Sequence, residues 1–273
     1  MGNKVYFERY QNIYRFMDTI QSRPNNDKFG RDSSESGDWY GTKTWDEAME
    51  QFSNGIPETA EKLKKSLDAF KANSNICATK SRPINYYYGH TPNIPAAIIG
   101  LPKSMRKVER TPQKVKAISL VFNQNESCEV GADTLRKAGE CVLQMVYALE
   151  LRGYRVTLDI LAFASQNEGR AFILAINVKD WKQHLDILKL SFPVTSPAMF
   201  RRMGFRWAET MPGVEGGRVW GYGTPIVRDS DKGRKRLESA GYDLKTTYMV
   251  TIDDCKKSDF DALEVAKKLG IIL

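Results

Sequence analysis

Val115-Lys-Ala-Ile-Ser-Leu-Val-Phe122 and the polar Asn123-Gln-Asn-Glu-Ser127 that follows decide the fold expected for this chain. The first segment is a nearly continuous run of apolar, β-favouring residues, which is typical of a strand buried on both faces of a sheet. A long helix is expected next, over 132–152, because apolar residues recur there at helical spacing and Gly153 follows them. This order of strand, turn and helix predicts an α/β protein.

Two further strands are expected after this helix, at 154–163 and 171–178, with a short polar turn between them. A turn of this length predicts that they pair as an antiparallel hairpin at the edge of the sheet. The remaining elements are expected further along: helices near 181–190 and 197–203, a strand at 247–252, and a final helix over 259–269 that Ser258 caps. Residues 113–273 are therefore predicted to form a mostly parallel sheet with an antiparallel edge hairpin.

Residues 1–72 are predicted to form a helical N-terminal lobe. Apolar and aromatic residues at helical spacing between Val5 and Ile20 predict an amphipathic helix. Thr44 and Glu47 have the spacing of a capping box, which predicts a helix that begins near Trp45, and a second helix is expected over 58–72.

Residues 73–112 are predicted to form an irregular connecting lobe. They contain Tyr86-Tyr-Tyr and several prolines, with one short apolar segment at 95–101. The tyrosines have two interpretations: they pack the lobe onto a core, or they stack nucleic-acid bases.

The composition limits the class of protein and its partners. The net charge is +8, which favours a polyanionic partner such as nucleic acid or an acidic protein surface, with simple solubility as the alternative. The four cysteines are far apart and form no C-x-x-C pair, which favours reduced thiols in the cytoplasm. The sequence shows no signal peptide and no apolar stretch long enough to span a membrane, so no membrane partner is expected.

Three polar segments are expected to converge at one end of the sheet. Asn123–Ser127 leaves the first strand, Asp253-Asp254 leaves the strand at 247–252, and Thr195-Ser196 follows a helix after the hairpin. In open α/β sheets, ligands bind at the carboxyl ends of the strands. The sequence therefore predicts that the chain around residues 125 and 253 lies side by side there.

The order of elements in residues 113–273 resembles a von Willebrand factor A domain, a Rossmann-like fold. In that family the first strand ends in Asp-x-Ser-x-Ser, and a threonine and a late aspartate complete a divalent cation site. The resemblance implies a site for Mg²⁺ at Asn123, Asn125, Ser127, Thr195 and Asp253.

This sequence departs from that pattern at the leading position. Asn123 stands where the family has a carboxylate, and a hard divalent cation prefers carboxylate oxygen. Glu126 or Asp254 could supply the missing carboxylate. The alternative interpretation is that these polar residues cap helices and close turns.

Three short motifs carry a second resemblance. They are Trp39-x-Gly41-x-x-x-Trp45-x-Glu47-Ala48, Ala148-Leu-Glu-x-x-Gly153-Tyr-x-Val156 and Met199-Phe-Arg-Arg-Met-Gly-Phe205. Together they resemble an uncharacterised family of tailed-phage and prophage proteins. The resemblance implies a viral or host protein partner and a location in the host-cell cytoplasm or the virion, and it supplies no catalytic residues.

Basic residues cluster at 201–202, at 232–236 and across 103–116, and the first two clusters supply candidates for nucleic-acid binding. Lysines and arginines near phosphates release counterions and give salt-dependent affinity, although such runs are also common on solvated surfaces. The candidate residues are Arg201, Arg202, Arg234, Lys235 and Arg236.

These observations lead to two functional hypotheses. The first is a phage-type, non-catalytic binding or assembly protein that acts through the von Willebrand A-like domain. The alternative is a basic nucleic-acid-binding protein, with metal-assisted phosphoryl chemistry at the strand ends.

Overall fold

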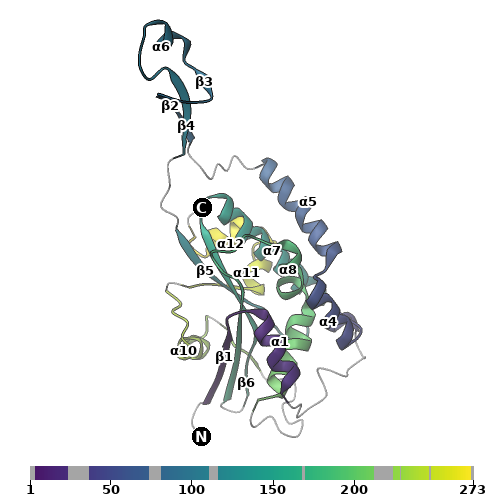
Figure 1. Ribbon diagram of the computed structural model, residues 1–273. Helices are drawn as coiled ribbons and strands as arrows, with labels where there is room; N and C mark the ends of the chain where they lie inside the picture. Colours follow the sequence, from purple (N-terminus) through teal and green to yellow (C-terminus); the bar gives the residue numbers. More distant parts are fainter. Residues whose placement is uncertain are drawn as a thin grey trace.

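The computed structural model describes residues 4–23, 37–73, 81–110, 116–167, 170–211, 224–227, 229–245 and 247–271. The main body is built around one six-stranded sheet, and residues 81–110 form a second, three-stranded sheet. Figure 1 shows this smaller sheet projecting from one end of the body, and we call residues 81–110 the arm. The predicted α/β fold class is confirmed.

The main sheet is mostly parallel, as predicted. Its strands are β1 (Lys4–Tyr10), β5 (Ala117–Asn123), β6 (Arg155–Asn167), β7 (Arg170–Lys179), β8 (Thr224–Pro225) and β9 (Tyr248–Thr251). The order is β1-β7-β6-β5-β9, with β8 paired to β6. The pairs β1–β7, β5–β6 and β5–β9 are parallel, whereas β6 pairs antiparallel with β7 and with β8.

The N-terminal segment corrects two predictions. Residues 5–20 do not form one helix, because β1 covers Lys4–Tyr10 and α1 begins only at Ile13 and ends at Ser22. β1 pairs with β7, so the β6–β7 hairpin lies inside the sheet and not at its edge. Alternate side chains of β1 pack on opposite faces of the sheet, as in any strand. The aromatic residues of this segment also fit a helical spacing, which is why the sequence predicted a helix.

The helices of the body are α3 (Gly37–Tyr40), α4 (Trp45–Asn54), α5 (Pro57–Asn73), α7 (Ala132–Leu151), α8 (Ile187–Leu190), α9 (Phe205–Glu209), α10 (Asp231–Ser239), α11 (Ile252–Lys256) and α12 (Ala262–Lys268), with π-helices η1 (Ser191–Thr195) and η2 (Met199–Gly204). Helices α4, α5 and α7 lie close to their predicted positions. The helix expected near 181–190 is limited to α8, and Ile252, expected to end a strand, begins α11. Within the described residues, none of the helices has the length and apolarity needed to cross a bilayer.

The final helix begins later than predicted. Asp259 and Phe260 have φ angles of 48° and 56°, which a right-handed helix does not accommodate. The Asp261 side chain caps α12 by accepting from the backbone N–H groups of Leu263 and Glu264. Asp261 therefore holds the capping role that the sequence assigned to Ser258.

The main core lies between one face of the sheet and α7. The inner side of α7 is buried, including all of the predicted stripe of Leu135, Ala138, Val142, Met145, Val146 and Leu149. A smaller core covers the opposite face, where Leu237 of α10 and Tyr242 pack on Val121 and Ile173. Both faces of β5 are thus buried, as the apolar run predicted.

Gly139 allows η1 to lie directly against α7. A Cβ atom at Gly139 would stand 2.2 Å from the carbonyl oxygen of Val194, far inside van der Waals contact. The absence of a side chain at this position therefore fixes how closely these two elements approach.

The arm is regular where the sequence predicted irregular structure. It contains β2 (Ser81–Tyr86), β3 (Thr91–Pro92), α6 (Ile94–Ile98) and β4 (Met105–Arg110), with β4 in the middle of the sheet. Prolines at several positions concealed this pattern, since proline is rare inside strands. The predicted lobe boundaries near residues 73 and 112 adjoin 74–80 and 111–115, which lie outside the described residues.

Candidate functional site

The carboxyl ends of β5 and β9 lie side by side. Asn123, the last residue of β5, is the parallel partner of Thr251, the last residue of β9. The loops that leave both strands therefore start at the same edge of the sheet, and this part of the prediction is confirmed.

The side chains of Asn123 and Asn125 hold the backbone together at this edge. Asn123 Oδ1 accepts from the backbone N–H and from Nδ2 of Asn125, at 3.1 and 2.9 Å. Asn125 Oδ1 accepts from the backbone N–H of Ala164 at 2.6 Å, and Asn125 Nδ2 also donates to the carbonyl of Leu161. Both amides are buried and connect the loop after β5 to β6.

Thr195 comes to the same end of the sheet but faces its own helix. Gln124 Nε2 donates to the carbonyl oxygen of Pro193 at 2.7 Å, which joins the β5 loop to η1. The Thr195 hydroxyl is buried and donates to the carbonyl oxygen of Ser191 at 2.6 Å. Ser127 accepts from the backbone N–H of Glu129. These hydroxyls therefore stabilise local turns.

Glu126 and Asp253 are the carboxylates that approach each other here. Burial raises the pKa of Glu126, and the negative charge of Asp253 raises it further. Asp253 is 59% exposed, and its Oδ2 lies 3.9 Å from Lys257 Nζ. Asp254 is engaged in the capping box of α11 with Thr251.

Four of the five predicted Mg²⁺ ligands are engaged in hydrogen bonds within the protein. The oxygens of Asn123 and Asn125 point at backbone N–H groups, and a cation would have to displace those hydrogen bonds. In the described part of the chain, no group of three or more His, Cys, Asp and Glu residues is arranged to hold a metal. The alternative interpretation, that these polar residues close turns, describes the observed geometry.

Arg201 is fully buried in η2 and contacts the N-terminal half of the chain. Its Nη1 donates to the carbonyl oxygen of Trp39 and its Nη2 to that of Val130, both at 2.6 Å. The guanidinium also lies 4.1 Å from the centroid of the Trp39 ring. Burial lowers the pKa of Arg201 to about 10, because the charged form loses its hydration.

Arg202 is buried beside it and contacts a different loop. Its Nε donates to the hydroxyl of Thr42 and its Nη2 to the carbonyl of Thr42, both at 2.7 Å. The Tyr40 ring lies 4.4 Å from the guanidinium. The prediction that Arg201 and Arg202 offer their charges to nucleic acid is therefore wrong, since both side chains are 0% exposed.

The second basic run lies on α10. Arg234 and Lys235 are exposed, whereas Arg236 is buried and its pKa is lowered by that burial. Arg234 and Lys235 are therefore the two predicted nucleic-acid residues that remain accessible.

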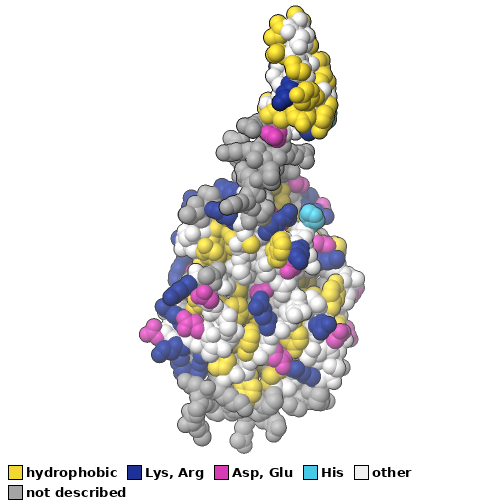
Figure 2. All heavy atoms as spheres, turned by 60° about the vertical axis from the view of Figure 1, so that its left-hand side comes forward, with side chains coloured by type: hydrophobic (Ala, Val, Ile, Leu, Met, Phe, Trp, Pro, Cys, Tyr) yellow, Lys and Arg dark blue, Asp and Glu magenta, His cyan; other side chains and the backbone are white. Residues whose placement is uncertain are grey.

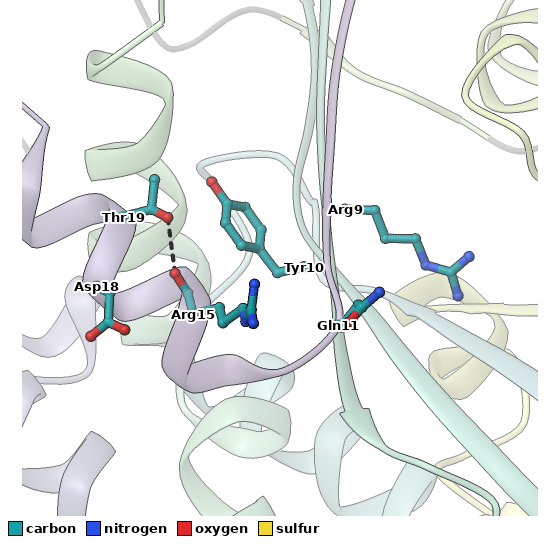
Figure 3. A pocket seen from close by; sticks show the side chains of 6 residues that line it. All are labelled: Arg9, Tyr10, Gln11, Arg15, Asp18 and Thr19. Atoms are coloured by element: carbon teal, nitrogen blue, oxygen red, sulfur yellow. Dashed lines mark hydrogen bonds between the residues drawn. The ribbon is translucent and has the colours of Figure 1, made fainter.

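A surface cavity of 670 Å³ lies beside the end of β1, lined by Arg9, Tyr10, Gln11, Arg15, Asp18 and Thr19. Figure 3 shows Tyr10 pointing toward α1 and Arg9 pointing away from it, as alternate residues of a strand do. Arg9 pairs with the fully buried Asp159 at 2.6 Å, and Asn177 also donates to Asp159.

On the α1 side of β1, the Glu8 carboxylate accepts hydrogen bonds from three side chains. The donors are Tyr10 OH, both Nη atoms of Arg23 and Trp207 Nε1. Burial alone would raise the pKa of Glu8, but these hydrogen bonds outweigh it and the pKa is lowered. Burial and the bond to Glu8 raise the pKa of Tyr10 to about 12. This network could not be predicted from the sequence, because Trp207 lies 199 positions from Glu8 along the chain.

The arm carries most of the exposed apolar side chains. Of the eleven large apolar side chains that are exposed in the described residues, seven belong to it: Tyr87, Tyr88, Ile94, Ile98, Ile99, Leu101 and Val108. Figure 2 shows apolar side chains covering much of the arm, in contrast to the mixed surface of the body. Among residues 83–109, Ala96 is the one buried side chain, so this surface has no core beneath it.

The surface of the arm carries two separate groups of side chains. Near its end, α6 and the turn after it expose Ile94, Ile98, Ile99 and Leu101, which we call the tip. Closer to the strands, three tyrosines cluster with two lysines. Lys107 Nζ lies 5.0 and 4.5 Å from the ring centroids of Tyr86 and Tyr88, and it donates to Tyr88 OH at 3.0 Å.

Comparison with known proteins gives one match. Neither a curated protein nor a solved structure matches the chain. A family model described as "Domain of unknown function (DUF7192)" matches residues 1–272, which include the arm as well as every strand of the main sheet. The chain therefore belongs to the DUF7192 family.

Proposed function

We propose that this chain is a non-catalytic binding or assembly protein, and that the tip of the arm binds a protein partner. The observation that carries the proposal is the exposure of Ile94, Ile98, Ile99 and Leu101, at 63, 78, 70 and 50%. Four branched aliphatic side chains in eight residues leave a concentrated apolar surface in contact with water.

Such a surface is costly unless it is covered. Contiguous apolar patches on soluble chains typically mark interaction sites, whereas single exposed apolar residues are ordinary. On the body, the exposed examples are Tyr14, Trp181, Leu188 and Val227, which come from separate elements. The tip differs because its residues are consecutive or one helical turn apart, so a single groove could bury them together.

The positive charge of the arm indicates what kind of partner would bind it. Residues 81–110 contain five Lys or Arg residues and one acidic residue, and the rest of the chain is also net positive. A second copy would therefore meet like charge. An apolar groove with an acidic rim, on a different protein, complements both the isoleucines and the basic residues.

The two family resemblances of the sequence also support this proposal. The sheet domain, proposed as von Willebrand A-like, would present the arm, and the phage-like motifs in residues 39–205 would place the partner in a virion or an infected cell. The loops at the strand ends contribute less than expected, because their side chains are engaged within the protein.

Site-specific photo-cross-linking tests this function. A photoreactive residue at position 98 of the full chain, in cells that naturally express it, should give one defined adduct with an acidic protein. The same residue at Tyr14, which is 61% exposed on α1, is the matched control and should not give it. Ile94→Ser with Ile99→Ser should abolish the adduct. An adduct with a second copy, an adduct insensitive to these substitutions, or none at all would overturn the proposal.

The alternative function is nucleic-acid binding, which the exposed Arg234 and Lys235 on α10 favour. With Arg201 and Arg202 buried, these two residues alone make a weak phosphate-binding surface. The arm offers a stronger candidate, where Lys103 and Lys107 lie beside the tyrosines.

A further inference from the structure

We propose that the tyrosine–lysine face of the arm binds single-stranded nucleic acid by base stacking. The face consists of Tyr86, Tyr87, Tyr88, Lys103 and Lys107, and it is separate from the isoleucine tip. The proposal is therefore independent of the protein-binding function.

The strand register places these groups on one surface. Tyr86 pairs with Met105 and Ile84 pairs with Lys107, so Tyr86 and Lys107 lie on the same face of the β2–β4 pair. Tyr87 and Tyr88 continue from the end of β2, with their ring centroids 5.6 and 5.0 Å from that of Tyr86.

The tyrosine rings are accessible for stacking. Tyr87 and Tyr88 are 62 and 61% exposed, and they meet Tyr86 edge to face, at interplanar angles of 75° and 89°. Edge-to-face contact leaves much of each ring plane open. Aromatic side chains in this condition stack unpaired bases, and they do so with little sequence preference because every base has a π face.

The two lysines put positive charge beside the tyrosine rings, close to where the phosphates of a stacked strand would pass. Lys107 Nζ is within 5.0 Å of two ring centroids, and Lys103 Nζ is 5.5 Å from that of Tyr87. Because a base inside a duplex is already stacked, this arrangement selects single strands over double strands.

The charge of the arm fits a polyanion. Arg106 is exposed on β4, and Glu109 is the one acidic residue in the sequence of the arm. Binding that depends on several phosphate contacts should weaken steeply with salt.

Fluorescence anisotropy of the full chain tests this proposal. The probes are labelled oligothymidine and oligouridine of roughly twelve nucleotides, and a duplex of the same length. We expect salt-dependent binding of one or both single strands and at least about tenfold weaker binding of the duplex. The two single-stranded probes also show whether DNA or RNA is preferred.

Matched substitutions assign the binding to this face. Tyr87→Ala with Tyr88→Ala should weaken binding at least about tenfold, whereas Tyr14→Ala on the body should leave it unchanged. Tyr87→Phe with Tyr88→Phe keeps the rings and should retain binding within a few fold. Lys103→Glu with Lys107→Glu should weaken binding and flatten its salt dependence, and Lys65→Glu on α5 should have little effect.

Three results would overturn the proposal. They are no binding at low salt, equal binding of duplex and single strand, and loss of binding with Arg234→Glu and Lys235→Glu but not with the tyrosine substitutions. Ile98→Ser at the tip should not affect nucleic-acid binding, so failure of this proposal is distinguishable from failure of the protein-binding function. Equal thermal midpoints of the variants and the parent chain verify that each variant is folded.

Discussion

The guanidinium of Arg201 lies over the ring of Trp39, 4.1 Å from its centroid, and at the same time donates a hydrogen bond to the carbonyl oxygen of Trp39. One side chain thus holds both the ring and the backbone of a residue 162 positions earlier in the chain. A single arginine therefore connects η2 to the segment that precedes α4.

This geometry predicts that Arg201→Lys destabilises the protein. A lysine cannot reach the carbonyls of Trp39 and Val130 together, and it leaves a buried charge with fewer partners. We expect a loss of about 2 kcal/mol or more in the free energy of unfolding, measured with urea. Arg234→Lys on the exposed side of α10 is the control and should change stability by less than about 0.5 kcal/mol. Equal effects of the two substitutions would contradict the buried role.

Asn125→Ala should destabilise the protein without any involvement of metal. The substitution leaves the buried backbone N–H of Ala164 without its partner, which costs about 1–3 kcal/mol. The loss should be the same in EDTA and in excess Mg²⁺. Asp253→Asn, at an exposed position, should have little effect. A loss that appears only when Mg²⁺ is present would instead identify Asn125 as a ligand.

Glu8→Gln should reduce stability at neutral pH and reduce its dependence on acid. The pKa of Glu8 is lowered by folding, so its contribution is present above about pH 4.5 and is lost as the pH falls further. We expect the substitution to cost about 1 kcal/mol at pH 7, since a neutral amide accepts less strongly from Arg23.

The measurement is urea unfolding at several pH values between 7 and 3. The difference between Glu8→Gln and the parent chain should shrink as the pH falls. Glu238→Gln, exposed on α10, provides the reference. If the difference stays constant with pH, the carboxylate of Glu8 is not the source of the stability.

Gly139→Ala should destabilise the protein, although alanine is the better helix former. The added Cβ would meet the carbonyl oxygen of Val194 at 2.2 Å, so η1 would have to move away from α7. Overpacking of this kind costs about 1–3 kcal/mol. Gly131→Ala is the matched control, because nothing lies within 4 Å of a Cβ there, and thermal unfolding of both variants provides the measurement. A stabilised Gly139→Ala variant would show that η1 can move away from α7 at little cost in free energy.

The sequence predicted the central elements because their patterns are long and have one period. The apolar run of β5 and the inner stripe of α7 have no competing interpretation, and both are buried as expected. The meeting of β5 and β9 followed from the topology of parallel sheets. Each of these predictions depends on a pattern of apolar residues over a whole element, so one residue that departs from the pattern does not change the prediction.

The errors occurred where two patterns compete. In β1, aromatic residues satisfy a helical period and a strand period at once, and pairing with β7 decides between them. In Met199-Phe-Arg-Arg-Met-Gly-Phe205, two arginines read as a basic surface, yet the apolar residues around them are the signal of a buried segment. Only the positions of Trp39 and Thr42 in space show what these arginines bind.

The strand pairing of the arm also has a consequence for how this family can vary. Ser81 and Arg110, the first and last residues of the arm, are cross-strand partners, so the chain leaves and returns at neighbouring points. A segment with adjoining ends can be lengthened, shortened or replaced without changing the register of the main sheet. Relatives could therefore acquire a new binding specificity through changes in the arm alone, while the fold of the main body stays the same.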